Sequence, residues 1–175
     1  MEIIPVPQLR QTYDYDCGAK ALQSILAYYG IEAREDKIMK FAKTSKKGTP
    51  IRGMVTATEK FGLKTEIKGM TIKDIKEYIK KDIPVILILQ AWTGKKEVDW
   101  EKDWADGHYV VAIGYTKDKV LFVDPSSFQY TYLKYNELEK RWHDVDTDGK
   151  KYDHYGIAIF GKKPKFKKCK MVHMD

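Results

Sequence analysis

Apolar residues recur at the three- and four-residue spacing of amphipathic helices in several parts of this 175-residue chain. The first apolar stripe predicts a helix that begins near Asp16 and ends at Gly30, where glycine suits a helix C-cap. Its members are Leu22, Ile25, Leu26 and Tyr29. Further helices are expected over residues 34–44, 53–61, 71–81 and 133–142.

Apolar runs with the pattern of strands dominate the second half of the chain. The most apolar run, residues 83–90, predicts the central strand of a sheet. A short polar connection, TKDK, joins the runs HYVVAIGY and VLFVD, and this arrangement predicts an antiparallel hairpin. Shorter strands are expected over residues 63–69 and 155–162. Helices first and antiparallel strands later predict an α+β fold, with the N-terminal helices packed on an antiparallel sheet.

Composition agrees with one globular domain, which we place at residues 1–161. The sequence contains 43% hydrophobic and 13% aromatic residues, enough to build a sizeable core. The formal net charge is +7, and six lysines within residues 162–170 account for most of it. The basic character therefore belongs to a C-terminal tail, residues 162–175, and a nucleic-acid-binding surface is not expected. This tail either binds an acidic partner or is a solvated chain end.

Two further features bear on the compartment. No apolar run approaches the roughly 20 residues that span a bilayer, and the N-terminus lacks the pattern of a signal peptide. The two cysteines, Cys17 and Cys169, lie near opposite ends of the chain and offer no disulfide framework. We therefore expect no transmembrane segment and a cytoplasmic location, where thiols stay reduced.

Cys17 is the first candidate for chemistry because of its place in the predicted helix. Asp16 is a good N-cap residue, which places Cys17 in the first helical turn. The macrodipole and the free N–H groups of that turn stabilise an anion, and they favour a reactive thiolate. The alternative is a buried structural cysteine that happens to begin a helix.

A thiolate nucleophile needs a base, and the base needs a group that orients it. Of the four histidines, His108 has the most suitable setting, between an Asp-Gly turn and an apolar strand. Asp124 ends the second strand of the predicted hairpin, so both residues lie at one end of the sheet. A tight turn in the centre of TKDK would place Asp124 opposite Val111 rather than His108. The catalytic interpretation therefore requires a turn nearer Thr116, or a β-bulge.

Several motifs along the chain resemble those of a known family. Gln11, followed by Asp16-Cys17-Gly18 at a helix start, resembles the signature of the bacteriocin-processing cysteine peptidases. Those are papain-like enzymes that form the peptidase domains of certain peptide exporters and cut leader peptides after a double glycine. The similarity continues in order through YYG, GTPIRGMVTATEKFGL, IPVILIL, HYVV and VDP. The family members are fused to a membrane transporter, whereas here we expect a stand-alone domain.

The resemblance implies a papain-like fold and a role for each of four residues. Cys17 would be the nucleophile, and His108 the general base and acid. Asp124 would orient the imidazole, and the Gln11 side chain would donate to the oxyanion. The resemblance also implies a peptide or protein substrate and no cofactor. Two alternatives stay open: a thiol acyltransferase or transglutaminase-like enzyme, in which an amine resolves the thioester, and a peptide-binding module without turnover.

The segment AWTGKKEVDWEKDWADG, between the predicted central strand and His108, is rich in tryptophan and acids. Because it leads into His108, we expect it to form one wall of the substrate cleft. Trp100 and Trp104 would supply stacking surface there, and the acids would favour a basic substrate segment. The alternative is that the tryptophans pin the loop to the body of the protein.

A second motif, DVDTDGKKYDHY, matches the opening of a calcium-binding loop. Its acids and glycine stand at Asp144, Asp146, Asp148 and Gly149. Tyr155 occupies the position that requires a bidentate glutamate, and Asp153 would only partly replace it. We therefore favour a polar turn between a helix and a strand over a calcium site. The histidines and cysteines lack zinc-ligand spacing, so no metal is expected.

Overall fold

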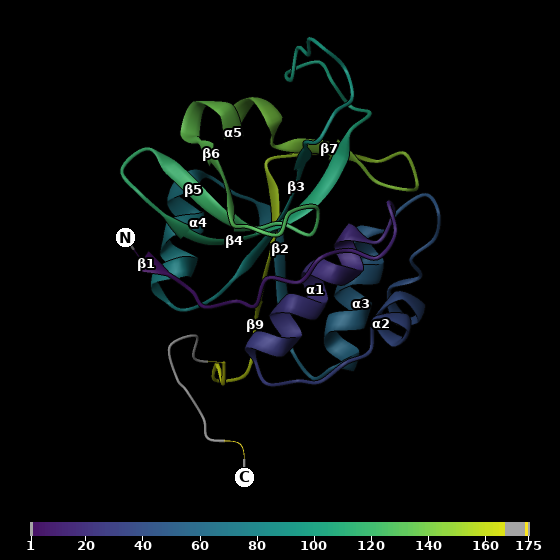
Figure 1. Cartoon of the computed structure of the whole chain (residues 1–175), viewed down its shortest axis with the longest axis vertical. Helices are drawn as coiled ribbons and strands as arrows, with labels where there is room; N and C mark the ends of the chain where they lie inside the picture. The colour runs from purple at the N-terminus through teal and green to yellow at the C-terminus, as the bar shows by residue number, and fades with distance from the viewer. Residues whose placement is uncertain (1, 167–173, 175) are drawn as a thin grey trace.

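The computed structural model describes residues 2–166 and 174, and it has the helices and strands labelled in Figure 1. The first half of the chain contains β1 (Glu2–Ile3), α1 (Cys17–Tyr28), α2 (Glu35–Ala42), α3 (Ile51–Lys60), β2 (Lys64–Gly69), α4 (Ile72–Lys80) and β3 (Val85–Gln90). The second half contains β4 (Gly107–Tyr115), β5 (Lys119–Val123), β6 (Thr131–Lys134), α5 (Tyr135–Arg141), β7 (His143–Val145), β8 (Lys151–Asp153) and β9 (Tyr155–Phe160).

Within the described residues, one seven-stranded sheet organises the fold. Its strands lie in the order β2-β9-β3-β4-β5-β6, β1 pairs with β4, and all of these pairs are antiparallel. Every residue of β3 is buried, because the strand lies between β9 and β4. The predicted central strand and the α+β fold are both confirmed. β7 and β8 form a separate hairpin.

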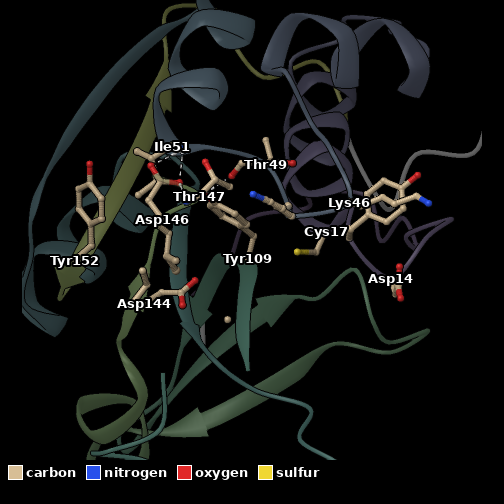
Figure 2. A pocket seen from close by; sticks show the side chains of 16 residues that line it. Asp14, Cys17, Lys46, Thr49, Ile51, Tyr109, Asp144, Asp146, Thr147 and Tyr152 are labelled. Carbon is tan, nitrogen blue, oxygen red and sulfur yellow. Dashed lines mark hydrogen bonds between the residues drawn. The ribbon is translucent and has the colours of Figure 1, made fainter. Parts of the chain in front are cut away.

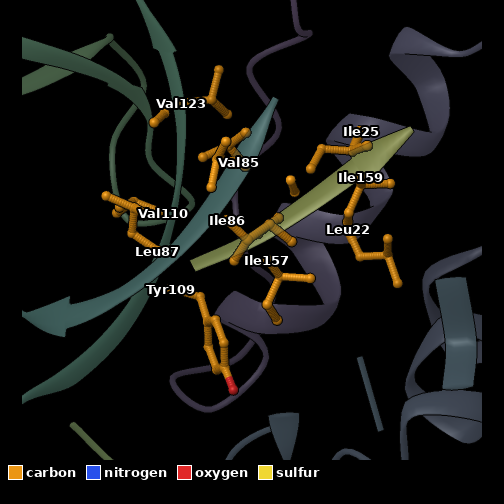
Figure 3. Packing of buried hydrophobic residues seen from close by; sticks show 14 of the residues in the cluster. Leu22, Ile25, Val85, Ile86, Leu87, Tyr109, Val110, Val123, Ile157 and Ile159 are labelled. Atoms are coloured by element: carbon orange, nitrogen blue, oxygen red, sulfur yellow. The ribbon is translucent and has the colours of Figure 1, made fainter. Parts of the chain in front are cut away.

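The helices lie on both sides of the sheet. Figure 1 shows α1, α2 and α3 gathered on one side of the molecule, and α4 and α5 on the other. Leu22 and Ile25 of α1 are fully buried and face Ile159 of β9 (Figure 3). Burying each such side chain stabilises the fold by about 1.5–3 kcal/mol. The apolar stripe of the first predicted helix is thus the surface that fixes α1 on the sheet.

The helix ends follow from specific contacts. Thr71 caps α4 in a capping box, in which its hydroxyl accepts from the N–H of Asp74 and the Asp74 carboxylate accepts from the N–H of Thr71. α3 begins at Ile51, two residues earlier than the pattern predicts. The reason is remote in sequence: both carboxylate oxygens of Asp146 lie 3.3 Å from the Ile51 nitrogen and stabilise that end.

The segment with the calcium-like pattern is the β7–β8 hairpin and not a link between a helix and a strand. Its turn is closed by the N–H of Asp146 donating to the Lys150 carbonyl, with Gly149 at φ +85°. The strands β6, β7 and β8 have three or four residues each, too few for an alternating pattern to predict.

The C-terminal segment packs back on α1 before the described part of the chain ends. The N–H groups of Lys165 and Phe166 both donate to the carbonyl of Tyr28, at 3.0 and 3.1 Å. Most of the predicted basic tail, including Cys169, lies in residues 167–173 and 175, outside the described residues. No helix within the described part of the chain is both long and apolar enough to cross a membrane.

Candidate active site

Cys17 is the first residue of α1, as expected, and its side chain is half-buried. The first N–H groups of a helix lack partners within the helix, so this end of α1 offers donors to an anion. Asp16 occupies the N-cap position, but its carboxylate does not cap α1. It accepts instead from the N–H groups of Thr12 and Tyr13, at 3.1 and 3.2 Å, in the preceding loop. The prediction that the Asp16 side chain caps α1 is therefore wrong.

The structure brings Cys17, His108 and Asp124 together. His108 Nε2 lies 2.8 Å from Asp124 Oδ1, and the two residues are 6% and 2% exposed. The Cys17 side chain lies near enough to the imidazole to raise its pKa. Because Nε2 faces the carboxylate, Nδ1 is the nitrogen left for the sulfur. The three side chains thus lie in the order Cys17, His108, Asp124 from the start of α1 to the end of β5.

A β-bulge makes this contact possible. The pairs Tyr115–Val120 and Gly114–Leu121 keep the register of a tight turn, but β4 then has one extra residue before the pair Ala112–Phe122. Continued by one step beyond Val111–Val123, the shifted register places Asp124 opposite Val110. A one-residue shift moves a side chain to the other face of a sheet. Asp124 therefore shares a face with His108 and reaches it diagonally along the sheet.

Asp124 is held by donors on both oxygens. Oδ1 accepts from His108 and from the N–H of Ser126 at 2.9 Å, and Oδ2 accepts from Trp92 Nε1 at 3.0 Å and Thr131 Oγ1 at 3.2 Å. Burial raises the pKa of Asp124, but the hydrogen bond and the charge of His108, with these donors, outweigh it. The pKa stays below its ordinary value, so the carboxylate is ionised.

The charge of Asp124 acts on His108. Burial lowers the pKa of the imidazole, whereas the hydrogen bond with Asp124 and the neighbouring Cys17 side chain raise it further than burial lowers it. The net result is a His108 pKa of about 9. The imidazolium is therefore the stable form at neutral pH, and it can form an ion pair with a thiolate.

Gln11 contacts the turn that follows β5, the Asp124 turn (residues 124–127), which is closed by the N–H of Ser127 donating to the Asp124 carbonyl. Its backbone N–H donates to the Pro125 carbonyl at 2.9 Å, and its Oε1 accepts from Ser126 Oγ at 3.1 Å. Its Nε2 donates to the Tyr13 carbonyl at 2.7 Å. These bonds fix the orientation of the amide and leave one Nε2 hydrogen for another acceptor.

Cys17 opens into a cavity of about 180 Å³, drawn in Figure 2. The side chains of Cys17 and Asp144 point into it from opposite walls, and Tyr109 lies between them. Burial raises the pKa of Asp144 to about 6, although Gln90 Nε2 donates to its Oδ1 at 2.9 Å. The β7–β8 hairpin therefore contributes an acid to the space beside the sulfur.

Comparison with known proteins identifies the family. The chain matches the model of the Peptidase C39 family over residues 6–146. It belongs to the Peptidase C39 family. The predicted resemblance is thereby confirmed, and the protein is a cysteine peptidase.

Two curated relatives are transport/processing ATP-binding proteins. MesD for mesentericin Y105, from Leuconostoc mesenteroides, is 29% identical over 133 residues, and PedD for pediocin PA-1, from Pediococcus acidilactici, is 25% identical over 136 residues. The matches cover 71% and 77% of this C39 peptidase. The chain spans only 17% of the length of either relative.

Solved structures agree on the fold. The peptidase domain of Streptococcus ComA matches with a TM-score of 0.67 at 22% identity, covering 88% of this chain and 97% of that one. A putative C39-like peptidase from Bacillus anthracis matches with a TM-score of 0.68 at 19% identity, covering 94% and 100%. These likenesses show the papain-like fold that the sequence predicts.

Trp92 is a site residue that sequence reasoning missed in this C39 peptidase. It donates to Asp124, its φ is +58°, and its side chain is 59% exposed. A non-glycine residue in that backbone region carries strain, which often marks a functional position. Trp92 lies two residues after Gln90, which pairs with Gly107 beside His108, and this pairing is not visible in the sequence.

The structure places Trp100 and Trp104 farther along the same loop. Arg141 of α5 lies over the Trp100 ring, 3.9 Å from its centroid. The Trp104 ring is 4.3 Å from that of His143, and His143 Nε2 bonds with the Asp103 carbonyl. These contacts pin the loop to the peptidase body, and a role in substrate binding stays a prediction.

The acids of the calcium-like segment accept hydrogen bonds from different donors and do not converge on one point. Asp144 accepts from Gln90, Asp146 from Ile51, and Asp148 from the N–H of Lys150. Within residues 2–166 and 174 of the peptidase, no three His, Cys, Asp or Glu side chains are grouped to hold a metal ion.

Proposed function

We propose that this peptidase hydrolyses peptide bonds with Cys17, His108 and Asp124 as its catalytic triad and Gln11 as an oxyanion donor. The observation that carries the proposal is the buried His108–Asp124 hydrogen bond, with Cys17 beside the imidazole. An imidazole held by a carboxylate next to a thiol is the arrangement that activates the thiol and orients its base.

The first half of the reaction is acylation. The Cys17 thiolate attacks the carbonyl carbon of the scissile bond, and the carbonyl oxygen becomes an oxyanion. The Cys17 backbone N–H and the second Nε2 hydrogen of Gln11 donate to it. The imidazolium of His108 then transfers its Nδ1 proton to the leaving nitrogen, the carbon–nitrogen bond breaks, and a thioester remains on Cys17.

The second half is hydrolysis of the thioester. Neutral His108 takes a proton from water, and the hydroxide oxygen attacks the thioester carbon. The acid product leaves, and Cys17 returns as a thiolate beside protonated His108. Asp124 stays ionised throughout, because it holds the imidazole by its Nε2 hydrogen.

We propose a peptide with a leader segment as the substrate, cut after a double glycine. The support is the family and the relatives: MesD and PedD are named as processing proteins, and a similar structure is a double glycine motif protease in complex with its leader peptide. The small cavity beside Cys17 suits a substrate with small residues at the cut.

Four further assignments belong to this proposal. Residues 1–161 form the peptidase unit, and residues 162–175 are a basic tail that binds an acidic partner. The enzyme works in the cytoplasm, because a reducing compartment keeps the free thiol of Cys17 reactive. Trp100 and Trp104 contact the substrate at the outer part of the cleft.

The test is labelling by a cysteine-directed electrophile, followed by peptide mapping, in the wild type, Cys17→Ala and His108→Ala. We expect fast labelling at Cys17 that slows steeply in His108→Ala, with Cys169 as the internal reference. Double-glycine peptides should be cut by the wild type. In both variants kcat should be at least about 10³-fold lower than in the wild type. Labelling at Cys17 no faster than at Cys169 would refute the triad. Products that carry an added amine instead of a free acid would indicate acyl transfer.

A further inference from the structure

A buried carboxyl group lies directly before the nucleophile. Asp16 is 0% exposed, although aspartate is rarely buried without a specific partner. Its two oxygens accept from the N–H groups of Thr12 and Tyr13, the residues that follow Gln11. The carboxyl group therefore fixes the loop before α1 and leaves the helix end free.

Glu35, the first residue of α2, reaches the same loop from another element. Its Oε2 accepts from Thr12 Oγ1 at 2.7 Å, and its Oε1 lies 2.8 Å from Lys20 Nζ of α1. The carboxyl groups of Glu35 and Asp16 also lie close enough to influence each other's pKa. The loop, α1 and α2 are thus tied together at one polar cluster beside Cys17.

The two carboxyl groups of the cluster influence each other's ionisation. Burial, together with the neighbouring Glu35 carboxyl group, raises the pKa of Asp16. Burial raises the pKa of Glu35 too, but its contacts with Lys20, Asp16 and Thr12 outweigh burial and lower it. The Glu35 carboxylate forms an ion pair with Lys20.

The opposite end of the loop is anchored at the Asp124 turn. Gln11 bonds there with Pro125 and Ser126, and its Nε2 donates to the carbonyl of Tyr13. The position of the Gln11 amide thus depends on both anchors: the Asp124 turn on one side and Asp16 on the other.

We propose that buried Asp16, supported by Glu35 and Lys20, is a positioning residue that holds the Gln11 amide at the oxyanion. The inference rests on the proposed function of Gln11. Losing one oxyanion donor costs about 10²–10³ in kcat, so misplacing it costs a fraction of that.

The test compares turnover with alkylation in the full-length chain. Turnover is measured on a peptide ending in Gly-Gly joined to a fluorogenic amine, and alkylation with iodoacetamide, which reacts without forming an oxyanion. In Asp16→Ala, kcat should fall about 10- to 100-fold with KM within about threefold, whereas the alkylation rate of Cys17 should stay within about threefold. Asp16→Asn keeps one oxygen that can accept from the loop and loses the other, so its kcat should fall less than that of Asp16→Ala.

A second variant covers the case in which Asp16→Ala fails to fold. Thr12 is exposed, so Thr12→Val removes its bond to Glu35 with little risk to the core. Its kcat should fall several-fold at unchanged alkylation. The inference is overturned if Asp16→Asn loses as much kcat as Asp16→Ala, or if alkylation falls in parallel with turnover in either variant. A wild type that is alkylated rapidly but cuts no peptide would instead refute the proposed function.

Discussion

The charge of Asp124 should set the alkaline limit of activity. The pKa of His108 is about 9 against an ordinary value of 6.5, which corresponds to about 3 kcal/mol in favour of the imidazolium. The hydrogen bond with Asp124 is the largest of the contributions that raise it. Acylation uses the imidazolium to protonate the leaving nitrogen, so kcat/KM should fall as the pH rises through about 9.

Asp124→Asn keeps the size of the side chain and removes its charge. Loss of a neighbouring opposite charge lowers a histidine pKa by roughly one to two units. The alkaline limb of kcat/KM should therefore move to about pH 7–8. The variant should also be less stable, because every neighbour of the carboxylate donates: His108, the N–H of Ser126, Trp92 and Thr131. An amide nitrogen placed among such donors loses its own partners.

The assay is kcat/KM between pH 5 and 11, with denaturation curves at each end to confirm folding. Trp92→Phe is the matched control, because it removes one donor to Asp124 but leaves the charge in place. Its alkaline limb should stay near pH 9, with kcat reduced only several-fold. An Asp124→Asn profile that still ends near pH 9 would refute the reasoning. It would show that the contact with Cys17 alone keeps His108 protonated.

Two further predictions concern Asp144 and the tryptophans of the loop before His108. Burial raises the pKa of Asp144 to about 6 from 3.8, so its proton stabilises the folded state below pH 4, and that stability is lost as the pH rises through 6. Asp144→Asn should raise the free energy of unfolding by about 3 kcal/mol at pH 8 and hardly at all at pH 4, measured by urea denaturation. Replacing Trp100 and Trp104 with alanine should raise KM several-fold if they contact substrate. An unchanged KM with the fold intact would leave them as loop anchors.

The elements that local pattern predicts are those with long, regular periods. The helix after Cys17 and the run over residues 83–90 were predicted because each buries a continuous apolar surface. The start of α3 at Ile51 was not, since it depends on Asp146 from a hairpin far along the chain. Short strands such as β7 are also not predicted from the local sequence pattern, because their pairing is decided by neighbours in space.

In the candidate site, too, the features with local causes were predicted and those with non-local causes were not. The residue types and their contexts singled out Cys17, His108 and Asp124, which the structure brings together. The bulge that joins them has a non-local cause. β4 pairs with β3 up to Ala112 and with β1 from Gly114, and the extra residue lies at that change of partner. An N-terminal strand therefore helps to decide which face Asp124 occupies, and no local pattern contains that information.

Gly107 offers a sharp test of how Asp144, in the β7–β8 hairpin, and the start of β4 depend on each other. The sequence identifies Asp-Gly only as a turn, but a Cβ at Gly107 would lie 2.3 and 2.4 Å from the carboxylate oxygens of Asp144. Gln90, itself fully buried, holds that carboxylate in place. Gly107→Ala should therefore force Asp144 aside, cost about 1–3 kcal/mol and lower kcat, because His108 is the next residue.

The cause is identified by a double-mutant cycle. Asp144→Ala removes the obstacle, so it should recover most of the stability and turnover that Gly107→Ala loses, with a coupling energy of about 1–2 kcal/mol. Gly94→Ala is the matched control, since a Cβ there meets nothing within 4 Å and should be neutral. If Gly107→Ala is as harmless as Gly94→Ala, the carboxylate moves freely. If the double variant is no better than Gly107→Ala alone, the glycine is needed for the strand itself, and Asp144 has no part in placing His108.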